Sequence, residues 1–203
     1  MEAYKNHLGE IQKHPKHWAY VYEHHRRRVS LVSTKPIVLS QLFTIVASLF
    51  AGYLLDLNKE SISLIAGAFI LLPGIVDLEA SLTGALTAKI NHQTAKLKAP
   101  NWLIVSYSIL FSLTVSIFAS LIIGLVGGLI GYLIFSASIY KLVILSVVTT
   151  SIVALINFPL MSVFTLLVQK LRINPDNVVG PVQSSVIDIV AILAVAVVAK
   201  WLI

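Results

Sequence analysis

Long apolar runs separated by short polar breaks dominate the chain from residue 37 to its end. These runs cover approximately residues 37–55, 61–90, 102–135, 140–171 and 181–203. An α-helix rises about 1.5 Å per residue, so about 20 apolar residues are enough to cross the hydrocarbon core of a bilayer. The pattern therefore predicts an all-α polytopic membrane protein with five transmembrane helices.

Three of the predicted helices are longer than one crossing requires. We expect the second helix to be broken at Pro73 and the fourth at Pro159, because proline removes a backbone donor and crowds the preceding turn. The glycine-rich stretch from Gly124 to Gly131 is a further place where a long helix could break. Its glycines have small-xxx-small spacing, which permits close packing between helices.

The composition supports a membrane protein and excludes several chemistries. Hydrophobic residues make up 57% of the 203 residues and charged residues only 12%, whereas about a quarter of a soluble domain is charged. The net charge of +6 is better explained by membrane topology and anionic lipid than by nucleic acid. Because the chain has no cysteine, disulfides and thiolate metal sites are excluded.

The distribution of lysine and arginine predicts the orientation. With a cytoplasmic N-terminus, twelve of the fifteen lie on the cytoplasmic side, seven of them in the first 35 residues. This bias predicts that the C-terminus lies outside. We expect residues 1–35 to form a basic cytoplasmic or interfacial arm and residues 36–203 to form the transmembrane domain. The arm carries five of the six histidines, but no acidic or cysteine cluster accompanies them to favour a metal sensor.

Three acidic residues, Asp77, Glu79 and Asp188, fall in or beside the apolar runs. A buried carboxylate needs a partner or a proton. The predicted spans contain no internal basic side chain that could neutralise these acids. A cation from solution is therefore a plausible partner, and oxygen ligands suit Mg²⁺, Mn²⁺ or Ca²⁺. The alternative for each acid is a protonated residue that only packs.

Small polar side chains accompany the acids. Ser184 precedes Asp188 by one helical turn, and Asn157 lies just before a proline of the fourth run. Asp77 and Glu79 are two residues apart, so they do not share one face of a regular helix. Either that turn is distorted, or only one of the two faces the interior.

Two stretches resemble a known family. NPDNVVGPVQSSVIDIVAI, residues 174–192, resembles the entry to the last transmembrane helix of MgtE-type magnesium transporters. The positions that match the family pattern are Pro175, Asp176, Asn177, Pro181, Ser184, Ser185 and Asp188, while Asn174 replaces the usual first aspartate. LLPGIVDLEASLTGALTAK, residues 71–89, is similar to the family's second helix, with Ala80 and Ser81 in place of a Gly-Asn pair.

The resemblance implies a fold, a function and a set of ligands. It implies a five-helix unit that works as a homodimer in the cell membrane and transports a divalent cation, Mg²⁺ before Mn²⁺ or Ca²⁺, along its second and fifth helices. Asp188 and its dimer mate would hold hydrated Mg²⁺, with Asp176 and Asn177 at the cytoplasmic mouth. For the stretch Asn174-Pro175-Asp176-Asn177, simple turn and cap chemistry is an equal alternative. The predicted ligands are Asp188, Asp77, Glu79, Asp176, Asn177, Ser184, Ser81 and Asn157.

Two other functions are compatible with the sequence. One is a proton-coupled exporter of organic cations or another solute, in which the acids would carry protons. The other is a membrane scaffold without transport, in which neutralising the three acids would leave function intact. An enzyme is not expected, because the spans contain neither a nucleophile–base pair nor a histidine metal set. No nucleic-acid partner is expected.

Overall fold

The computed structural model describes residues 15–97, 101–171 and 173–203, with side chains from residue 34 onward except at 95–100 and 172. The elements are α2 (Pro15–Ser63), α3 (Ala68–Leu97), α4 (Trp102–Phe135), α5 (Ile139–Lys170), η1 (Pro175–Asn177) and α6 (Val179–Trp201). The chain divides into two compact units, Met1–Leu39 and Ser40–Ile203. The second unit is described below. Most of the predicted basic arm lies outside the residues with described side chains, so its role and its boundary at residue 35 stay predictions.

The prediction of five membrane-spanning helices is confirmed. Five helical segments are long and apolar enough to cross a membrane, at 34–63, 68–94, 102–135, 139–170 and 179–201. The predicted start of the second helix at residue 61 is wrong, because α2 continues to Ser63 and α3 begins at Ala68. Gly67 makes the turn between them with a φ of 83°, a conformation that favours glycine. A side chain there would also crowd Gly131 and Leu142.

The predicted breaks at proline are not seen in the structure. Pro73 lies inside α3 and Pro159 inside α5, and both helices continue on either side. The glycine-rich part of α4 is also continuously helical. A proline removes one backbone hydrogen bond, and the remaining bonds of a long packed helix can maintain its course.

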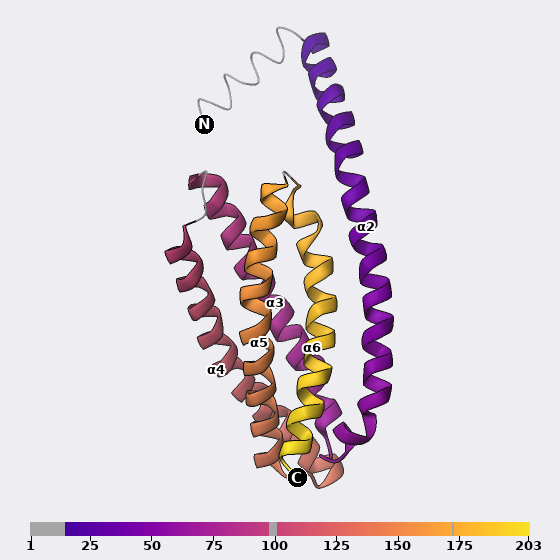
Figure 1. The fold of residues 1–203 in the computed structure, drawn as a ribbon, viewed down its shortest axis with the longest axis vertical. Helices are drawn as coiled ribbons and strands as arrows, with labels where there is room; N and C mark the ends of the chain where they lie inside the picture. Colours follow the sequence, from indigo (N-terminus) through magenta and orange to yellow (C-terminus); the bar gives the residue numbers. More distant parts are fainter. Residues whose placement is uncertain (1–14, 98–100, 172) are drawn as a thin grey trace. The chain divides into compact units, whose positions relative to one another are not determined.

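Helices α3, α4, α5 and α6 form a packed bundle (Figure 1). Within it, α5 packs against the other three helices, and α3 packs against α4 and α6. Near the Gly67 turn, a buried apolar cluster includes Ile65, Leu142 and Val195. A second cluster, toward the other end of α3, includes Ile90 and Phe158. Apolar burial is thus shared along the bundle and fixes how its helices face one another.

The buried face of α4 consists mainly of small residues. Its buried positions include Ser108, Ser112, Ser116, Ser120, Gly124 and Gly128, each four residues after the one before. This spacing places all of them on one side of the helix. A Cβ atom added to Gly124 would lie 2.9 Å from the Cα atom of Val143, so the backbones of α4 and α5 approach closely there.

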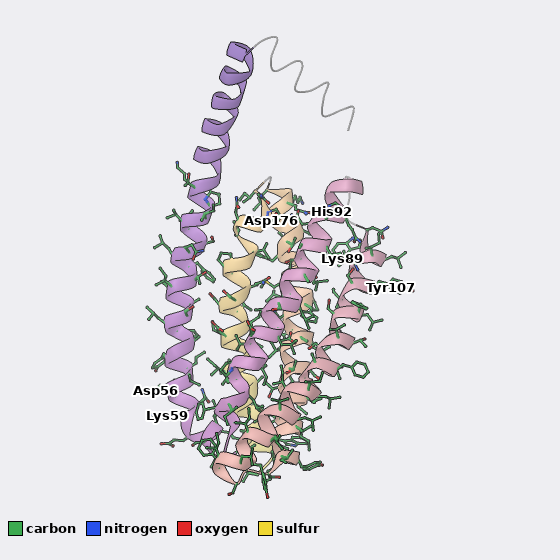
Figure 2. All side chains as sticks on the ribbon, turned by 180° about the vertical axis from the view of Figure 1, so that it is seen from behind. Asp56, Lys59, Lys89, His92, Tyr107 and Asp176 are labelled. Carbon is green, nitrogen blue, oxygen red and sulfur yellow. The ribbon has the colours of Figure 1, made fainter. Side chains whose placement is uncertain are left out.

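Charged side chains gather at the two ends of the second unit. Figure 2 shows Lys89, His92 and Asp176 at one end, and Asp56 and Lys59 at the opposite end. Asp56 and Lys59 form an exposed ion pair of 2.7 Å. Charges at both ends of long apolar helices are what a protein that crosses a membrane requires.

Candidate functional site

The acids Asp77 and Glu79 of α3 face different surroundings. Glu79 has no exposed surface, whereas Asp77 is exposed. Two residues along a helix correspond to a rotation of about 200°, so a regular helix turns these side chains in nearly opposite directions. The structure therefore favours the second of the two predicted arrangements, in which only one of the pair faces the interior.

Glu79 and Asn157, both predicted ligands, lie in the interior between α3, α4 and α5. Ser116 Oγ of α4 donates a hydrogen bond of 2.5 Å to Glu79 Oε1, while Glu79 Oε2 has no partner. Asn157 Nδ2 of α5 donates to Thr83 Oγ1 of α3 at 2.7 Å. These contacts join α3 to α4 and α5, so neither residue is brought together with Asp188 of α6.

On the other side of α3, the antiparallel helix α6 lies alongside. Gln183 Nε2 donates to the carbonyl of Ala80 at 3.1 Å, and Ala80 also packs against the apolar cluster that contains Ile187. Farther along α3, Asn91 donates a hydrogen bond to Asp176 of η1. Residues of higher number on α3 therefore lie beside residues of lower number in η1 and α6. This register places Asp77 and Asp188 at about the same level of the two helices.

Asp188 lies half-buried on α6. No hydrogen bond or ion pair joins its carboxylate to another described residue. Ser184, one turn earlier, uses its hydroxyl hydrogen to bond the carbonyl of Pro181 at 2.9 Å. The Asp188 carboxylate thus lies at the same level of the bundle as the buried apolar clusters. It has no protein partner among the described residues. On α3, the predicted ligand Ser81 is exposed.

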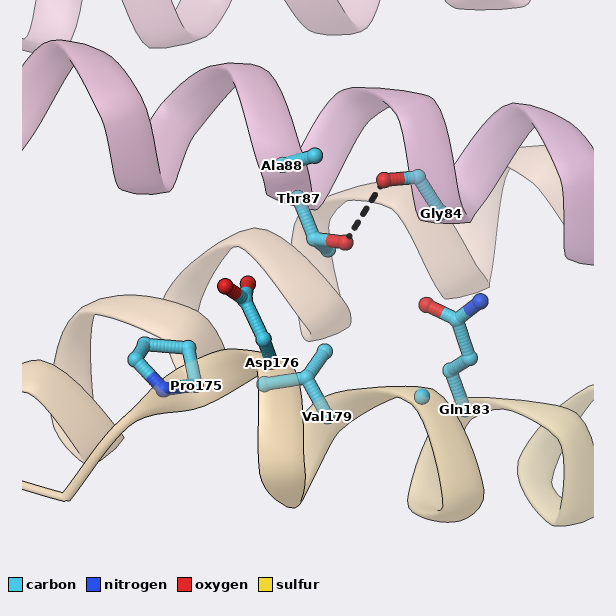
Figure 3. A pocket seen from close by; sticks show the side chains of 8 residues that line it. Gly84, Thr87, Ala88, Pro175, Asp176, Val179 and Gln183 are labelled. Atoms are coloured by element: carbon cyan, nitrogen blue, oxygen red, sulfur yellow. Dashed lines mark hydrogen bonds between the residues drawn. The ribbon is translucent and has the colours of Figure 1, made fainter. Parts of the chain in front are cut away.

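A cavity of about 190 Å³ separates α3 from η1 and the start of α6 (Figure 3). Its lining residues are Gly84, Thr87 and Ala88 of α3, with Pro175, Asp176, Val179, Gly180 and Gln183 from the other side. The carboxylate of Asp176 points toward α3 in this view. One water molecule needs about 10–15 Å³ of such volume. The cavity therefore has room for a cation that keeps several of its waters.

A chain of side-chain hydrogen bonds holds Asp176 at one end of this cavity. Asn91 Nδ2 of α3 donates to Asp176 Oδ1 at 3.0 Å, and Gln169 Nε2 of α5 donates to Asn91 Oδ1 at 2.7 Å. Asn174 Oδ1 accepts from the backbone N–H of Asp176 at 3.2 Å, which is cap chemistry. The backbone carbonyl of Asn177 accepts from Ser40 Oγ at 3.2 Å. The NPDN stretch therefore does form a capped turn, and it also presents a carboxylate to the cavity.

Sequence reasoning missed several residues around the cavity. Gly84 and Thr87 line it from α3, and the four-residue spacing of the small residues Ala80, Gly84 and Ala88 could have indicated this face of the helix. Asn91 and Gln169, which hold Asp176, gave no local signal because they are far apart in the chain. Only the packing of α3 against α5 and η1 brings these side chains together.

The arrangement is suited to a hydrated hard cation. Among the described residues, no group of three or more histidine, cysteine or acidic side chains forms a ready metal cage. The possible metal ligands along α3 and α6 are instead single carboxylates, hydroxyls and amides with space beside them. Mg²⁺ releases its waters reluctantly and is usually held by one or two carboxylates, so such a surface suits it.

The comparisons with known proteins agree with this chemistry. A family model described as MgtE, divalent cation transporter, matches residues 72–198. The comparisons with curated proteins and with solved structures gave no match. The matched region extends from the start of α3 nearly to the end of α6 and so includes both sides of the cavity. The chain is therefore a multi-pass membrane protein that belongs to the MgtE family of divalent cation transporters, a family of transporters and not of enzymes.

Proposed function

We propose that this protein transports Mg²⁺ along the side of the bundle formed by α3 and α6, and that a second copy completes the pathway. The observation that carries the proposal is the position of Asp77 and Asp188 at one level of two membrane-spanning helices, with both side chains at least partly accessible. A charged side chain in the middle of the bilayer costs a few kcal/mol or more. This side of the bundle therefore needs water, a cation or more protein beside it.

The exposed face of α3 supports the same assignment. Asp77, Ser81, Gly84 and Ala88 follow one another at intervals of four, three and four residues, which is one face of a helix. All but the partly buried Gly84 are exposed. In a two-fold dimer this face would meet its copy, and the carboxylates of Asp77 and Asp188 would be doubled around the axis. Such a concentration of negative charge would attract a divalent cation.

Mg²⁺ fits this surface better than the other hard divalent cations. Ca²⁺ is usually enclosed by six to eight oxygen ligands, whereas Mg²⁺ keeps several waters and contacts few carboxylates. Asp188 and its dimer mate would hold the hydrated ion through water. Asp176 would attract the hydrated ion to the cavity, which lies at the cytoplasmic face if the N-terminus is cytoplasmic. Asn177, Ser184 and Ser81 would contribute through the water around the ion.

The first test is the thermal stability of the purified protein against a series of Mg²⁺, Mn²⁺, Ca²⁺ and Na⁺ concentrations. A ligand that binds only the folded state raises its stability by mass action. We expect Mg²⁺ to stabilise the wild type and to have little effect on Asp188→Asn. If Mg²⁺ stabilises both proteins equally, Asp188 is not the ion site.

Flux into proteoliposomes then separates transport from binding alone. We expect Mg²⁺ uptake that is lost in Asp188→Asn, and a protein mass in detergent that corresponds to two chains. Transport driven by a pH gradient without any divalent cation would instead support the proton-coupled exporter. A single-chain mass with full Mg²⁺ flux would overturn the homodimeric pathway.

A further inference from the structure

A second group of polar side chains lies on the opposite side of α3, enclosed by α4 and α5. Glu79, Thr83, Ser116, Thr150 and Asn157 all have no exposed surface. Three of their oxygen atoms have no hydrogen-bond partner, namely Glu79 Oε2, Thr150 Oγ1 and Asn157 Oδ1. Buried polar atoms are nearly always paired, so unpaired oxygens in this interior need an explanation.

The helix registers bring these side chains to neighbouring levels. Hydrogen bonds join Thr83 to Asn157 and Asn91 to Gln169, so α3 and α5 run in the same direction, and Glu79 is level with about residue 153. Helices α4 and α5 are antiparallel neighbours, and Ser146 Oγ donates to the carbonyl of Ser120 at 2.9 Å. One turn away from this contact, the same register places Ser116 of α4 level with Thr150 of α5.

The charges around this group sum to a single negative unit. Helix α4 contains no acidic or basic residue, and α5 has only Lys141 and Lys170, close to its ends. Helix α3 also carries Asp77, Lys89, His92 and Lys96, and α6 carries Asp188 and Lys200. The tyrosines of α4 and α5, namely Tyr107, Tyr132 and Tyr140, are exposed. None of the described ones forms an ion pair with Glu79. One unpaired carboxylate in a low-dielectric interior calls for one unit of positive charge.

We propose that Glu79, Ser116, Thr83 and Asn157 form a site for a small, dehydrated monovalent cation, of the size of Na⁺. A proton on Glu79 would neutralise the carboxylate but would leave Asn157 Oδ1 unpaired. A hard cation can satisfy both Glu79 Oε2 and Asn157 Oδ1, and carboxylate, hydroxyl and amide oxygens are its preferred ligands. Thr150 is seven residues from Asn157 on α5, about 10 Å along the helix, so it is too far away to share the ion. A divalent ion would leave an uncompensated charge in the interior.

A small ion is expected because the group is closely packed. Hydrogen bonds of 2.5 Å between Ser116 Oγ and Glu79 Oε1 and of 2.7 Å between Asn157 Nδ2 and Thr83 Oγ1 fix its side chains. These side chains are held by three closely packed helices, so the site favours Na⁺ or Li⁺ over K⁺. It is separate from the α3–α6 pathway and does not depend on the transport of Mg²⁺ there.

A second cavity lies on this side of the bundle, one turn of α4 from Ser116. This cavity of about 140 Å³ between α3 and α4 has Ser108, Ser112 and Val115 of α4 in its lining. Ser112 precedes Ser116 by one turn on the same buried face. Ser108 Oγ is a further buried oxygen without a partner. The serine hydroxyls of α4 therefore extend from this cavity to Glu79 and could replace the waters of an entering ion.

The test is the thermal stability of the purified protein against NaCl, LiCl and KCl, with choline chloride holding the ionic strength constant and a chelator removing divalent cations. We expect Na⁺ and Li⁺ to raise the melting temperature by a few °C for each tenfold increase above the dissociation constant. Glu79→Gln, which keeps the shape of the side chain, should abolish this shift. Glu60→Gln, the same change at an exposed position, should retain it.

Each outcome decides the proposal. The absence of a Na⁺ shift in the wild type, an equal shift with K⁺, or an unchanged shift in Glu79→Gln would each overturn it. If Glu79→Gln does not fold, Ser116→Ala takes its place, because it removes the hydroxyl beside the Glu79 carboxylate, and a full Na⁺ response in that variant overturns the site. Asp188→Asn should keep the Na⁺ response and lose the Mg²⁺ response, so failure of one site is distinguishable from failure of the other.

A gain of charge sharpens the test. Asn157→Asp adds a second carboxylate beside Thr83 and removes the Nδ2 donor of the present hydrogen bond. The new carboxylate oxygen can accept the Thr83 hydroxyl hydrogen instead, in a bond of reversed direction. In an Asp188→Asn background, we expect this variant to respond to Ca²⁺ or Mg²⁺ where the background alone does not. A variant that is folded and still responds only to Na⁺ would contradict the charge balance on which the site rests.

Discussion

The two sides of α3 present a carboxylate to opposite kinds of environment. On one side, exposed Asp77 lies level with half-buried Asp188 of α6, and a cavity of about 190 Å³ lies farther along the same two helices. On the other, Glu79 is fully buried against Ser116 and enclosed by α4 and α5. The first side is open and suits an ion with its water. The second is closed and suits an ion without water.

The difference shows how helical geometry separates residues that are neighbours in sequence. Asp77 and Glu79 are two positions apart, yet only Glu79 is covered by other helices of the same chain. The closed side is complete within one chain, because α3, α4 and α5 all contribute side chains to it. The open side presents carboxylates that lack protein partners, and in our proposal a second copy supplies the other half.

A pair of cysteine substitutions gives the strongest test of whether the two sides of α3 differ in their access to water. The chain has no natural cysteine, and Ser81 and Thr83 are small hydroxyl residues on the open and closed sides of α3. We expect Ser81→Cys to react nearly completely with a small, membrane-impermeant thiol reagent in proteoliposomes, and Thr83→Cys to remain close to background. Mg²⁺ should slow the reaction of Ser81→Cys. Equal labelling of the two variants would mean that the sides are not different.

Removing one charge from each side should separate their functions. Asp188→Asn is expected to lower Mg²⁺ flux about tenfold or more, because affinity at a hard-cation site depends on the number of charged ligands. Glu79→Gln should leave the stabilisation by Mg²⁺ unchanged. Flux of ²⁸Mg²⁺ into proteoliposomes measures the first effect, and melting curves measure the second. Loss of the Mg²⁺ response in both variants would indicate one shared site.

The closed side should be sensitive to added volume. Gly124→Ala would place a methyl group 2.9 Å from the Val143 backbone, and overpacking of this kind costs about 1–3 kcal/mol. Gly52→Ala is the matched control, since no atom lies within 4 Å of its added Cβ. Unfolding midpoints of the two variants against the wild type give the measurement. A neutral Gly124→Ala would show that α4 and α5 are not closely packed.

The smallest expected effect is at the mouth of the open side. Asp176→Asn keeps an oxygen that can accept the hydrogen bond from Asn91 and removes only the charge. We expect a few-fold decrease in Mg²⁺ flux at low ionic strength, because exposed charges attract ions only weakly through solvent. The decrease should shrink as salt is raised. A decrease that does not change with salt would assign Asp176 a direct ligand role.

The sequence by itself determined the five spans, the three acids within apolar runs and the family. Each depends on local information: apolar runs long enough for a bilayer, charges placed among them, and a motif over consecutive residues. Asn174 as a cap of the turn before α6 was equally local, since its side chain bonds a backbone group two residues away.

Only the tertiary structure decided which acid faces which neighbour. The helical period sets Asp77 and Glu79 apart, but it does not say which side the rest of the chain will cover. Pairings such as Asn91 with Asp176 and Glu79 with Ser116 join residues 85 and 37 positions apart, so no local pattern contains them. The predicted breaks at Pro73 and Pro159 were not found for the same reason. Whether a proline interrupts a long helix depends on the packing around it, and that packing is a property of the whole bundle.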